Sequence, residues 1–306
     1  MRDQNEGDGA GSAAAAAAGP AAPPRTLLAG YGEVGRAVAA RLAERGAPFL
    51  VVDPARAGEE VPGAGPAAAA LPEDLGAFDL VLAVTPASVA SGLAAEVARR
   101  PGGILHVDLS SAAPGAMAEA AALFSAPAAF VDGAIMGSVD LNGADTPIIL
   151  AGSEAARAAG MLERLGLPAT ALADSRPGDA AALKLLRSVV TKGIEAVAVE
   201  AYVAAHRLGL ADALRANLDD ISRRPFPDFL DAIVRTHPVH AARRAREVEA
   251  AIGELGAHAL PTDVSRAVLA RFETTAGRLA ADPPPQRLTA RPSAREAAAW
   301  LAGDER

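Results

Sequence analysis

The strongest constraint on the fold is a regular alternation of short apolar runs with stretches of helical periodicity in the first half of the chain. Runs that are apolar on both faces, with helices between them, are typical of a parallel sheet covered on both sides. Because crossovers in such sheets are right-handed, we expect an α/β doubly wound domain. The apolar runs occupy residues 26–29, 49–52, 79–84, 104–109, 129–135 and 148–151.

A G-x-G-x-x-G sequence follows the first apolar run and opens an amphipathic helix. Its first glycine permits a tight turn, its second lets the backbone approach a pyrophosphate, and its third allows close packing of helix on strand. The helix N-terminus supplies unpaired N–H groups for the phosphates. The motif predicts a dinucleotide-binding Rossmann domain. Its residues are Gly30, Tyr31, Gly32, Glu33, Val34 and Gly35.

The choice between NAD and NADP depends on the end of the second apolar run, where Asp53 stands. Its carboxylate can accept hydrogen bonds from a ribose 2′-hydroxyl and repels a 2′-phosphate, which favours NAD. Arg56 lies close by and could pair with a 2′-phosphate, so NADP stays an alternative.

Polar residues also follow later strands, at the edge where an open α/β sheet binds its ligands. Thr85 follows the run 79–84, and Ser110 and Ser111 follow the run 104–109. We expect Thr85 and Ser110 beside the cofactor, although helix capping is an equally good interpretation of the two serines.

The second half of the chain begins with a long helical stretch, residues 178–208, which has no proline and is mostly apolar. This composition predicts a helix buried on most sides. Lys184, Ser188, Thr191 and Glu195 nevertheless share one narrow stripe, which is either a solvated face or the wall of a polar cleft.

The domain organisation expected from these patterns has three parts. Residues 1–24 are of low complexity and predict a disordered tail. Residues 25–175 form the dinucleotide-binding Rossmann domain. Residues 176–306 form an all-α domain for substrate binding and dimerisation, joined to the first by the long helix. A second break is predicted at the prolines 283–285, before a short terminal helix anchored by Trp300.

Composition excludes several classes of function. The net charge of -8 argues against a nucleic-acid partner, because no basic stripe could displace counterions. No run is apolar enough for a membrane span, so we expect a cytoplasmic protein without a membrane partner. The sequence has no cysteine. A metal site at His237 and His240 is disfavoured, because Pro238 argues against a helix there and no carboxylate has a matching offset.

These motifs, in this order, resemble the β-hydroxyacid dehydrogenase family, which includes hydroxyisobutyrate and 6-phosphogluconate dehydrogenases. Besides GYGEVG with Asp53, the resemblance rests on DLSSAAPGAM (108–117), FVDGAIMGS (130–138) and GDAAALKLLRS (178–188). The later helical segments resemble the C-terminal domain of 6-phosphogluconate dehydrogenase. The resemblance implies an NAD(P)-dependent dehydrogenase that transfers hydride between a nicotinamide cofactor and a small hydroxyacid, and so a carboxylate substrate.

The resemblance also assigns roles to individual residues. Lys184 matches the family's catalytic lysine; in a partly desolvated cleft it could act as acid/base, with Ser188 positioning the substrate. The residues implied in substrate binding are Ser111, Met136, Gly137, Ser138 and Lys192. Three positions depart from the family pattern: Met136 replaces a serine, Ser138 a glycine and Ser188 an asparagine.

Two other functions stay open at this point. The segment DGAIM also resembles that of imine reductases, a sister group, although Lys184 favours alcohol chemistry. The altered substrate positions are also compatible with a catalytically silent cofactor-binding protein. The apolar surface expected on the helical half suggests a homodimer.

Overall fold

The computed structural model describes residues 22–281 and 292–304. The chain divides into two compact units, with the boundary between Arg187 and Ser188 inside the long helix; the sequence places a boundary at 175/176, ahead of that helix. The predicted tail, apart from residues 22–24, and the proline break at 283–285 lie outside the described residues. The two units are described separately.

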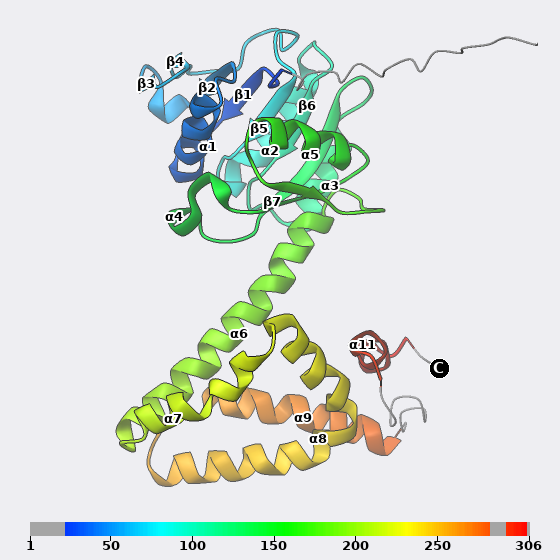
Figure 1. Ribbon diagram of the computed structural model, residues 1–306. Helices are drawn as coiled ribbons and strands as arrows, with labels where there is room; N and C mark the ends of the chain where they lie inside the picture. Colours follow the sequence, from blue (N-terminus) through cyan, green and yellow to red (C-terminus); the bar gives the residue numbers. More distant parts are fainter. Residues whose placement is uncertain (1–21, 282–291, 305–306) are drawn as a thin grey trace, which may run out of the picture. The chain divides into compact units, whose positions relative to one another are not determined.

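The first unit is built on a seven-stranded sheet in the order β2-β1-β5-β6-β7-β8-β9 (Figure 1). Neighbouring strands are parallel except β7 and β8, which pair antiparallel. The six predicted apolar runs all contain strands, so the expected fold class is confirmed. The strands are β1 (Thr26–Ala29), β2 (Phe49–Val52), β5 (Leu80–Ala83), β6 (Leu105–Asp108), β7 (Ala129–Ile135), β8 (Ile148–Ala151) and β9 (Ala169–Ala171).

Three short strands are not predicted from the sequence. They are β9 at one edge of the sheet and a hairpin of β3 (Glu60–Val61) and β4 (Gly65–Pro66). Each has only two or three residues, too few for an alternating or continuous apolar pattern to stand out from its surroundings.

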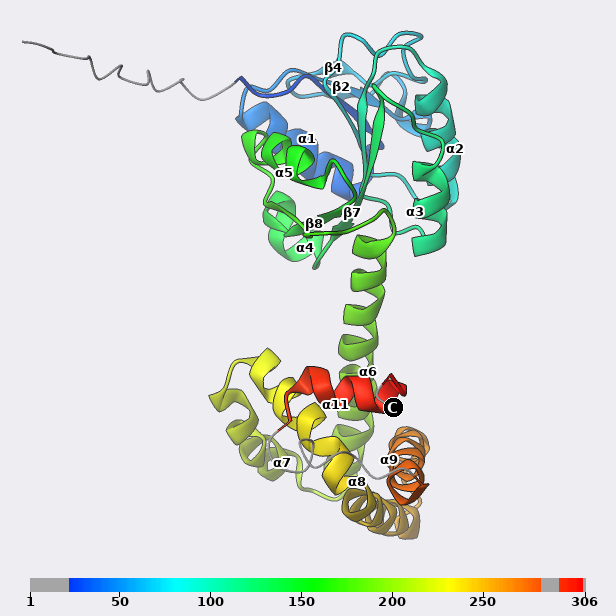
Figure 2. The same cartoon turned by 90° about the vertical axis from the view of Figure 1, so that its right-hand side faces the viewer.

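Helices cover both faces of the sheet (Figure 2). On one face, α1 (Glu33–Glu44) and α5 (Ala155–Arg164) contribute buried Leu42 and Leu162 to the largest apolar cluster. On the other face lie α2 (Ala87–Arg99) and α3 (Pro114–Ala121), with buried Val97 and Met117. A sheet whose strands are covered on both sides explains why the runs are continuously apolar.

The turn between β1 and α1 has glycines for two physical reasons. Gly30 has φ +106°, and a Cβ on it would lie 2.8 Å from the carbonyl oxygen of Val84 at the end of β5. A Cβ on Gly35 would overlap the carbonyl oxygen of Gly30. The helix can therefore begin this close to the strand only if both positions lack a side chain.

The second unit contains the later part of α6 (Asp179–Arg207) and is helical, as expected. Its other helices are α7 (Ala211–Asn217), α8 (Phe226–Ala257), α9 (Asp263–Ala281) and the terminal α11 (Ala294–Ala302). Trp300 of α11 is buried, and the guanidinium of Arg278 on α9 stacks 4.6 Å from the centre of its ring. α11 begins with a capping box formed by Ser293 and Glu296.

One expectation about this unit is wrong. The sequence argued against a helix around Pro238, but Pro238 lies inside α8 and is buried there. Its ring removes one backbone N–H donor from the helix. The helix nevertheless continues through this position: α8 runs unbroken from Phe226 to Ala257, and Pro238 and Ala241 are its buried residues. Tertiary packing has overridden a local preference.

The expectation that the long helix is buried on most sides is also wrong for a single chain. In α6, Leu186 is 65% exposed and Val189 is 72% exposed. Apolar side chains from Leu183 to Val203 share this exposure along the helix. The helix has the composition of a buried helix, but many of its apolar side chains between Leu183 and Val203 are exposed, while Ala180 and Ala181 near its start and Ala204 and Ala205 near its end are buried.

The glycine geometry of the β1–α1 turn predicts opposite outcomes for two alanine substitutions. Gly35→Ala should destabilise the protein by about 2 kcal/mol or more, because the new methyl group overlaps backbone that cannot move freely. Gly32→Ala should change stability by less than about 0.5 kcal/mol, because no atom lies within 4 Å of the added Cβ. Urea unfolding followed by circular dichroism measures both. Equal losses of stability would contradict this account of the turn.

Candidate functional site

The sheet has a switch point at β1, which has β2 on one side and β5 on the other. In open α/β sheets, ligands bind beyond the carboxyl ends of the strands at such a point. A cavity of about 320 Å³ lies there. Its lining residues are Glu33, Val34, Val84, Thr85, Leu109, Ser110, Ser111, Ile135, Gly137, Ser138, Val139 and Lys184.

The cavity brings together many of the residues singled out in the sequence. They come from five separate segments: Glu33, Val34, Thr85, Ser110, Ser111, Gly137, Ser138 and Lys184. Its apolar wall was not predicted. Val84, Leu109 and Ile135 are each the last residue of an apolar run, and this position could have identified them, because strand ends lie at the ligand-binding edge.

Lys184 is the cation of this cavity and lies half-buried in the second turn of α6. Its Nζ donates a hydrogen bond to Oγ of Ser111 at 2.9 Å. Within the described part of the chain, no carboxylate forms an ion pair with it. Burial lowers the pKa of Lys184 below the ordinary value of a lysine.

The start of α6 is held by Asp132, a buried carboxylate on β7. Its Oδ2 accepts hydrogen bonds from the backbone N–H groups of Gly178 and Ala180 at 2.9 Å and Ala181 at 3.2 Å. Burial raises the pKa of Asp132, and the three donors partly oppose that shift. Asp132 is not among the residues predicted from sequence; a carboxylate inside the apolar run 129–135 is the signal that could have identified it.

The glycine loop at the start of α1 leaves room for a ligand. No side chain caps the helix N-terminus, so backbone N–H groups of the first turn keep free hydrogen-bonding capacity. A Cβ on Gly32 would meet no atom within 4 Å, which means that the space above this residue is open. A pyrophosphate fits such a loop. The exposed carboxyl of Glu33 would repel the negative charge of a pyrophosphate when ionised. The hydrogen bond with neighbouring Asp140 raises the pKa of Glu33.

Asp53 stands at the end of β2, next to the glycine loop. Its Oδ2 accepts the backbone N–H of Tyr31 at 2.7 Å, and its Oδ1 accepts the N–H of Ala55 at 2.9 Å. These bonds fix the carboxylate while leaving a lone pair on each oxygen. Arg56 is engaged by Glu59 at 3.5 Å.

Glu59 forms an ion pair with a second arginine in addition to Arg56. Arg36 of α1 approaches the same carboxylate at 3.2 Å, and its guanidinium lies 5.3 Å from the centre of the Tyr31 ring. Two arginines therefore share one glutamate beside Asp53.

Several predicted residues lie elsewhere. The side chain of Met136 packs against a buried apolar cluster formed by Ala134, Ala151 and Ala180, so it does not line the cavity. Ser188 and Lys192 follow Lys184 along α6 but belong to the second unit. There, Nζ of Lys192 pairs with Glu195 at 2.9 Å.

The described helices include none long and apolar enough to cross a membrane.

Comparison with known proteins places the chain in a family. A domain of unknown function, DUF1932, matches residues 205–275. An uncharacterized 28.5 kDa protein in the 7S RNA 5′ region of Methanothermus fervidus is 33% identical over 119 residues, which are 39% of this chain and 45% of that protein. The match thus spans less than half the length of this curated relative.

Solved structures match over much more of the chain. One is a conserved protein of unknown function described as structurally similar to 3-hydroxyacid dehydrogenases; it is 30% identical, with a TM-score of 0.56, over 83% of this chain and 97% of that one. A conserved hypothetical protein from Sinorhizobium meliloti is 28% identical, with a TM-score of 0.53; the match covers 86% of this chain and 90% of that one. An imine reductase from Aspergillus terreus shares the fold. It is 19% identical, with a TM-score of 0.68, and the match covers 84% of this chain and 95% of that one.

The order of motifs and the near-complete coverage of a relative at 30% identity agree with the doubly wound sheet and the helical unit after it. The chain belongs to the family of 3-hydroxyacid dehydrogenase-like proteins, the β-hydroxyacid dehydrogenase family.

Proposed function

We propose that this protein is an NAD(P)-dependent oxidoreductase that transfers hydride between a nicotinamide cofactor and a small hydroxyacid. The observation that carries the proposal is the half-buried Lys184 in a cavity at the switch point of the sheet. That cavity begins at the glycine loop, whose open backbone suits a dinucleotide. A cation, a phosphate-binding loop and polar strand ends at one edge are what such a reaction requires.

The cofactor fit rests on the open space at Gly32. In this proposal, the backbone of Gly30 to Gly35 holds the pyrophosphate, Asp53 accepts from a ribose hydroxyl, and Thr85 and Ser110 lie beside the nicotinamide. When bound, the nicotinamide accepts or returns the hydride. Two proteins of similar fold, a reductive aminase and an imine reductase, were solved with NADPH and with NAD+ respectively.

Lys184 supplies the proton chemistry in this proposal. In the oxidation direction its neutral amine takes the proton of the substrate hydroxyl, and in reduction its ammonium returns that proton. Burial favours the neutral amine, and the hydrogen bond to Ser111 holds Nζ at the cavity wall. Gly137 and Ser138 then lie beside the substrate carboxylate.

Lys184→Ala should lower kcat for hydride transfer by roughly 10²- to 10⁴-fold, the usual contribution of a positioned acid/base. Cofactor affinity should stay within about twofold, because Lys184 is not part of the glycine loop. Arg187→Ala is the matched control on the same helix: its side chain is exposed and does not line the cavity. Turnover is followed at the nicotinamide absorbance over a panel of hydroxyacids, with imines as the comparison set.

The pH dependence of the same assay follows from the pKa of Lys184. Oxidation needs the neutral amine, so kcat/KM for oxidation should rise with pH, with the midpoint of the rise below pH 10.5, the ordinary pKa of a lysine. Reduction needs the ammonium and should fall over the same range. Retained turnover in Lys184→Ala, or activity confined to imines, would overturn the proposal.

We propose a preference for NAD, supported by the charges around the adenosine end. The carboxylate of Asp53 repels a 2′-phosphate, and Arg56 is already paired with Glu59.

Asp53→Asn should lower the preference for NAD+ over NADP+, measured as the ratio of kcat/KM values, by about tenfold, which corresponds to about 1.4 kcal/mol. The amide keeps the shape of the side chain and one acceptor oxygen. Glu73→Gln, at an exposed carboxylate outside the cavity, is the control for a general change in charge. A wild-type enzyme that favours NADP+ would contradict this part of the proposal.

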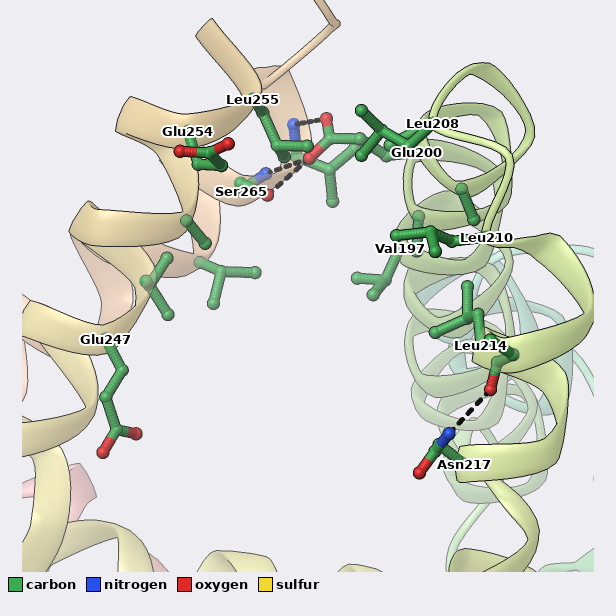
Figure 3. Close-up of a pocket in the computed structure, with 18 residues that line it drawn as sticks. Val197, Glu200, Leu208, Leu210, Leu214, Asn217, Glu247, Glu254, Leu255 and Ser265 are labelled. Carbon is green, nitrogen blue, oxygen red and sulfur yellow. Dashed lines mark hydrogen bonds between the residues drawn. The ribbon is translucent and has the colours of Figure 1, made fainter. Parts of the chain in front are cut away.

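We also propose a homodimer, supported by the amount of apolar surface on the second unit. A groove of about 700 Å³ lies between α6, α7, α8 and α9; Val197 and Leu214 face Leu255 across it (Figure 3). Together with exposed Val189, the groove leaves many apolar side chains of this unit open to water, and contiguous apolar surface of this kind is typical of interaction sites. Two-fold symmetry is the commonest way for a protein to cover such a surface.

Size-exclusion chromatography with light scattering should give twice the chain mass of 30.7 kDa at micromolar concentration. Val189→Glu should shift the protein to monomer, because it buries a carboxylate in the contact. Val89→Glu, at an exposed position of α2, is the control. A wild-type monomer would exclude the dimer while leaving the hydride-transfer proposal untouched.

A further inference from the structure

A second cavity of about 480 Å³ lies entirely within the second unit, between α8, α9 and α11. Its volume is typical of sites that hold small molecules. The cavity has no part in the proposed hydride transfer, and every side chain that lines it comes from residues 233–301. Helical spacing explains its construction: His237 and Arg244 are seven positions apart on α8, and Arg271, Thr275 and Arg278 follow i, i+4, i+7 on α9.

The charge of this cavity is unusual for the chain. Three arginines and a histidine line it, and none of its lining residues that the structure describes is an aspartate or a glutamate. In the parts of the chain that the structure describes, Arg244, Arg271 and Arg278 form no ion pair with a carboxylate. A protein with a net charge of -8 has many acidic side chains that could have paired with them. Guanidinium groups gathered without carboxylates favour an anion.

Two of the three arginines are held in place by neutral groups. Arg244 donates to Oγ1 of Thr236 at 3.0 Å, and Arg278 donates to the carbonyl of Leu301 at 3.2 Å while stacking on Trp300. Each guanidinium has five N–H donors, so these bonds leave donors free. Nε of Arg278 is buried and has no partner. Arg271 also lines the cavity, and its side chain is exposed.

The remaining side chains that line the cavity indicate which other chemical groups a ligand would need. Nε2 of His237 and Oγ1 of Thr275 lie 2.9 Å apart and present a polar wall. Burial and the neighbouring guanidiniums of Arg244 and Arg271 lower the pKa of His237. The cavity also has an apolar lining that includes Ile233 and Phe272, and the Phe272 ring lies 4.9 Å from the ring of His237. A ligand that fits both the polar and the apolar lining carries an anionic group on an apolar stem.

We propose that this cavity is a binding site for a small organic anion, a carboxylate or phosphate attached to an apolar group, independent of the dinucleotide site. The oxyanion pairs with Arg244 and Arg271, and the apolar stem packs on Ile233 and Phe272. The site is complete within residues of the second unit. It does not depend on the enzymatic proposal.

Isothermal titration of the full chain tests the site with phenyl phosphate, phenylacetate and inorganic phosphate at low ionic strength. Saturable binding of phenyl phosphate or phenylacetate at one site per chain, at least tenfold tighter than inorganic phosphate, is expected. The two aromatic probes distinguish a phosphate site from a carboxylate site. The absence of saturable binding of both, or equal affinity for inorganic phosphate, would overturn the proposal.

Arg271→Gln and Arg244→Gln should each weaken binding of the preferred probe at least tenfold. Arg243→Gln is the matched control: it removes the same charge from the same helix, but Arg243 pairs with Glu247 and does not line the cavity. Binding to this control should stay within twofold of wild type. An equal loss in Arg243→Gln would mean a general charge effect and would reject the site.

Location is checked independently by NMR of the histidine rings. The probe should shift the ring signals of His237, assigned by their loss in His237→Gln, and should raise its pKa, because an anion beside the ring favours the imidazolium. Heat of binding without a shift at His237 would place the anion elsewhere and reject the proposal. If Arg244→Gln fails to fold, Arg271→Gln still decides, since the Arg271 side chain is exposed and makes no hydrogen bond or ion pair with another described residue.

Discussion

The bonds between the carboxylate of Asp132 and the first N–H groups of α6 are the interaction on which the candidate site depends. They tie a central strand of the sheet to the helix that carries Lys184. Each hydrogen bond to a charged group contributes about 1.5–3 kcal/mol, and the helix dipole favours a negative charge at this end. Removing the carboxylate would leave the helix start without its acceptor, and Nζ of Lys184 would lose its defined place beside Ser111.

The carboxylate of Asp53 likewise accepts backbone N–H groups, beside the glycine loop. Asp53 accepts one N–H from the glycine loop and one from the segment after β2, so it joins two connections that approach the same edge of the sheet. Gly30 and Gly35 let α1 begin close enough to β1 for this arrangement. The site is therefore positioned from the sheet outward: Asp132 within β7 and Asp53 at the end of β2 accept backbone N–H groups, and these bonds fix the start of α6 and the glycine loop.

Much of this could be predicted from sequence because it follows local periodicity. The apolar runs at 26–29 and 79–84 identify β1 and β5, and the glycine motif identifies the turn between β1 and α1. Failures came where packing competes with local preference. Pro238 lies within a continuous helix although its ring removes a donor, and α6 has the composition of a buried helix but is exposed in the single chain. Met136 turned toward an apolar cluster because successive side chains of a strand point to opposite faces.

By itself, the sequence determined the class of the fold and the place of the glycine motif, since both depend on spacing along the chain, and a family resemblance singled out Lys184. Only the tertiary structure decided which strand ends meet Lys184, that Ser111 is its hydrogen-bond partner and that Asp132 anchors its helix. The arginine-lined cavity also became visible only there. The physical reason is common to all of these: they join residues far apart in sequence, and only chain packing sets the distances between such residues.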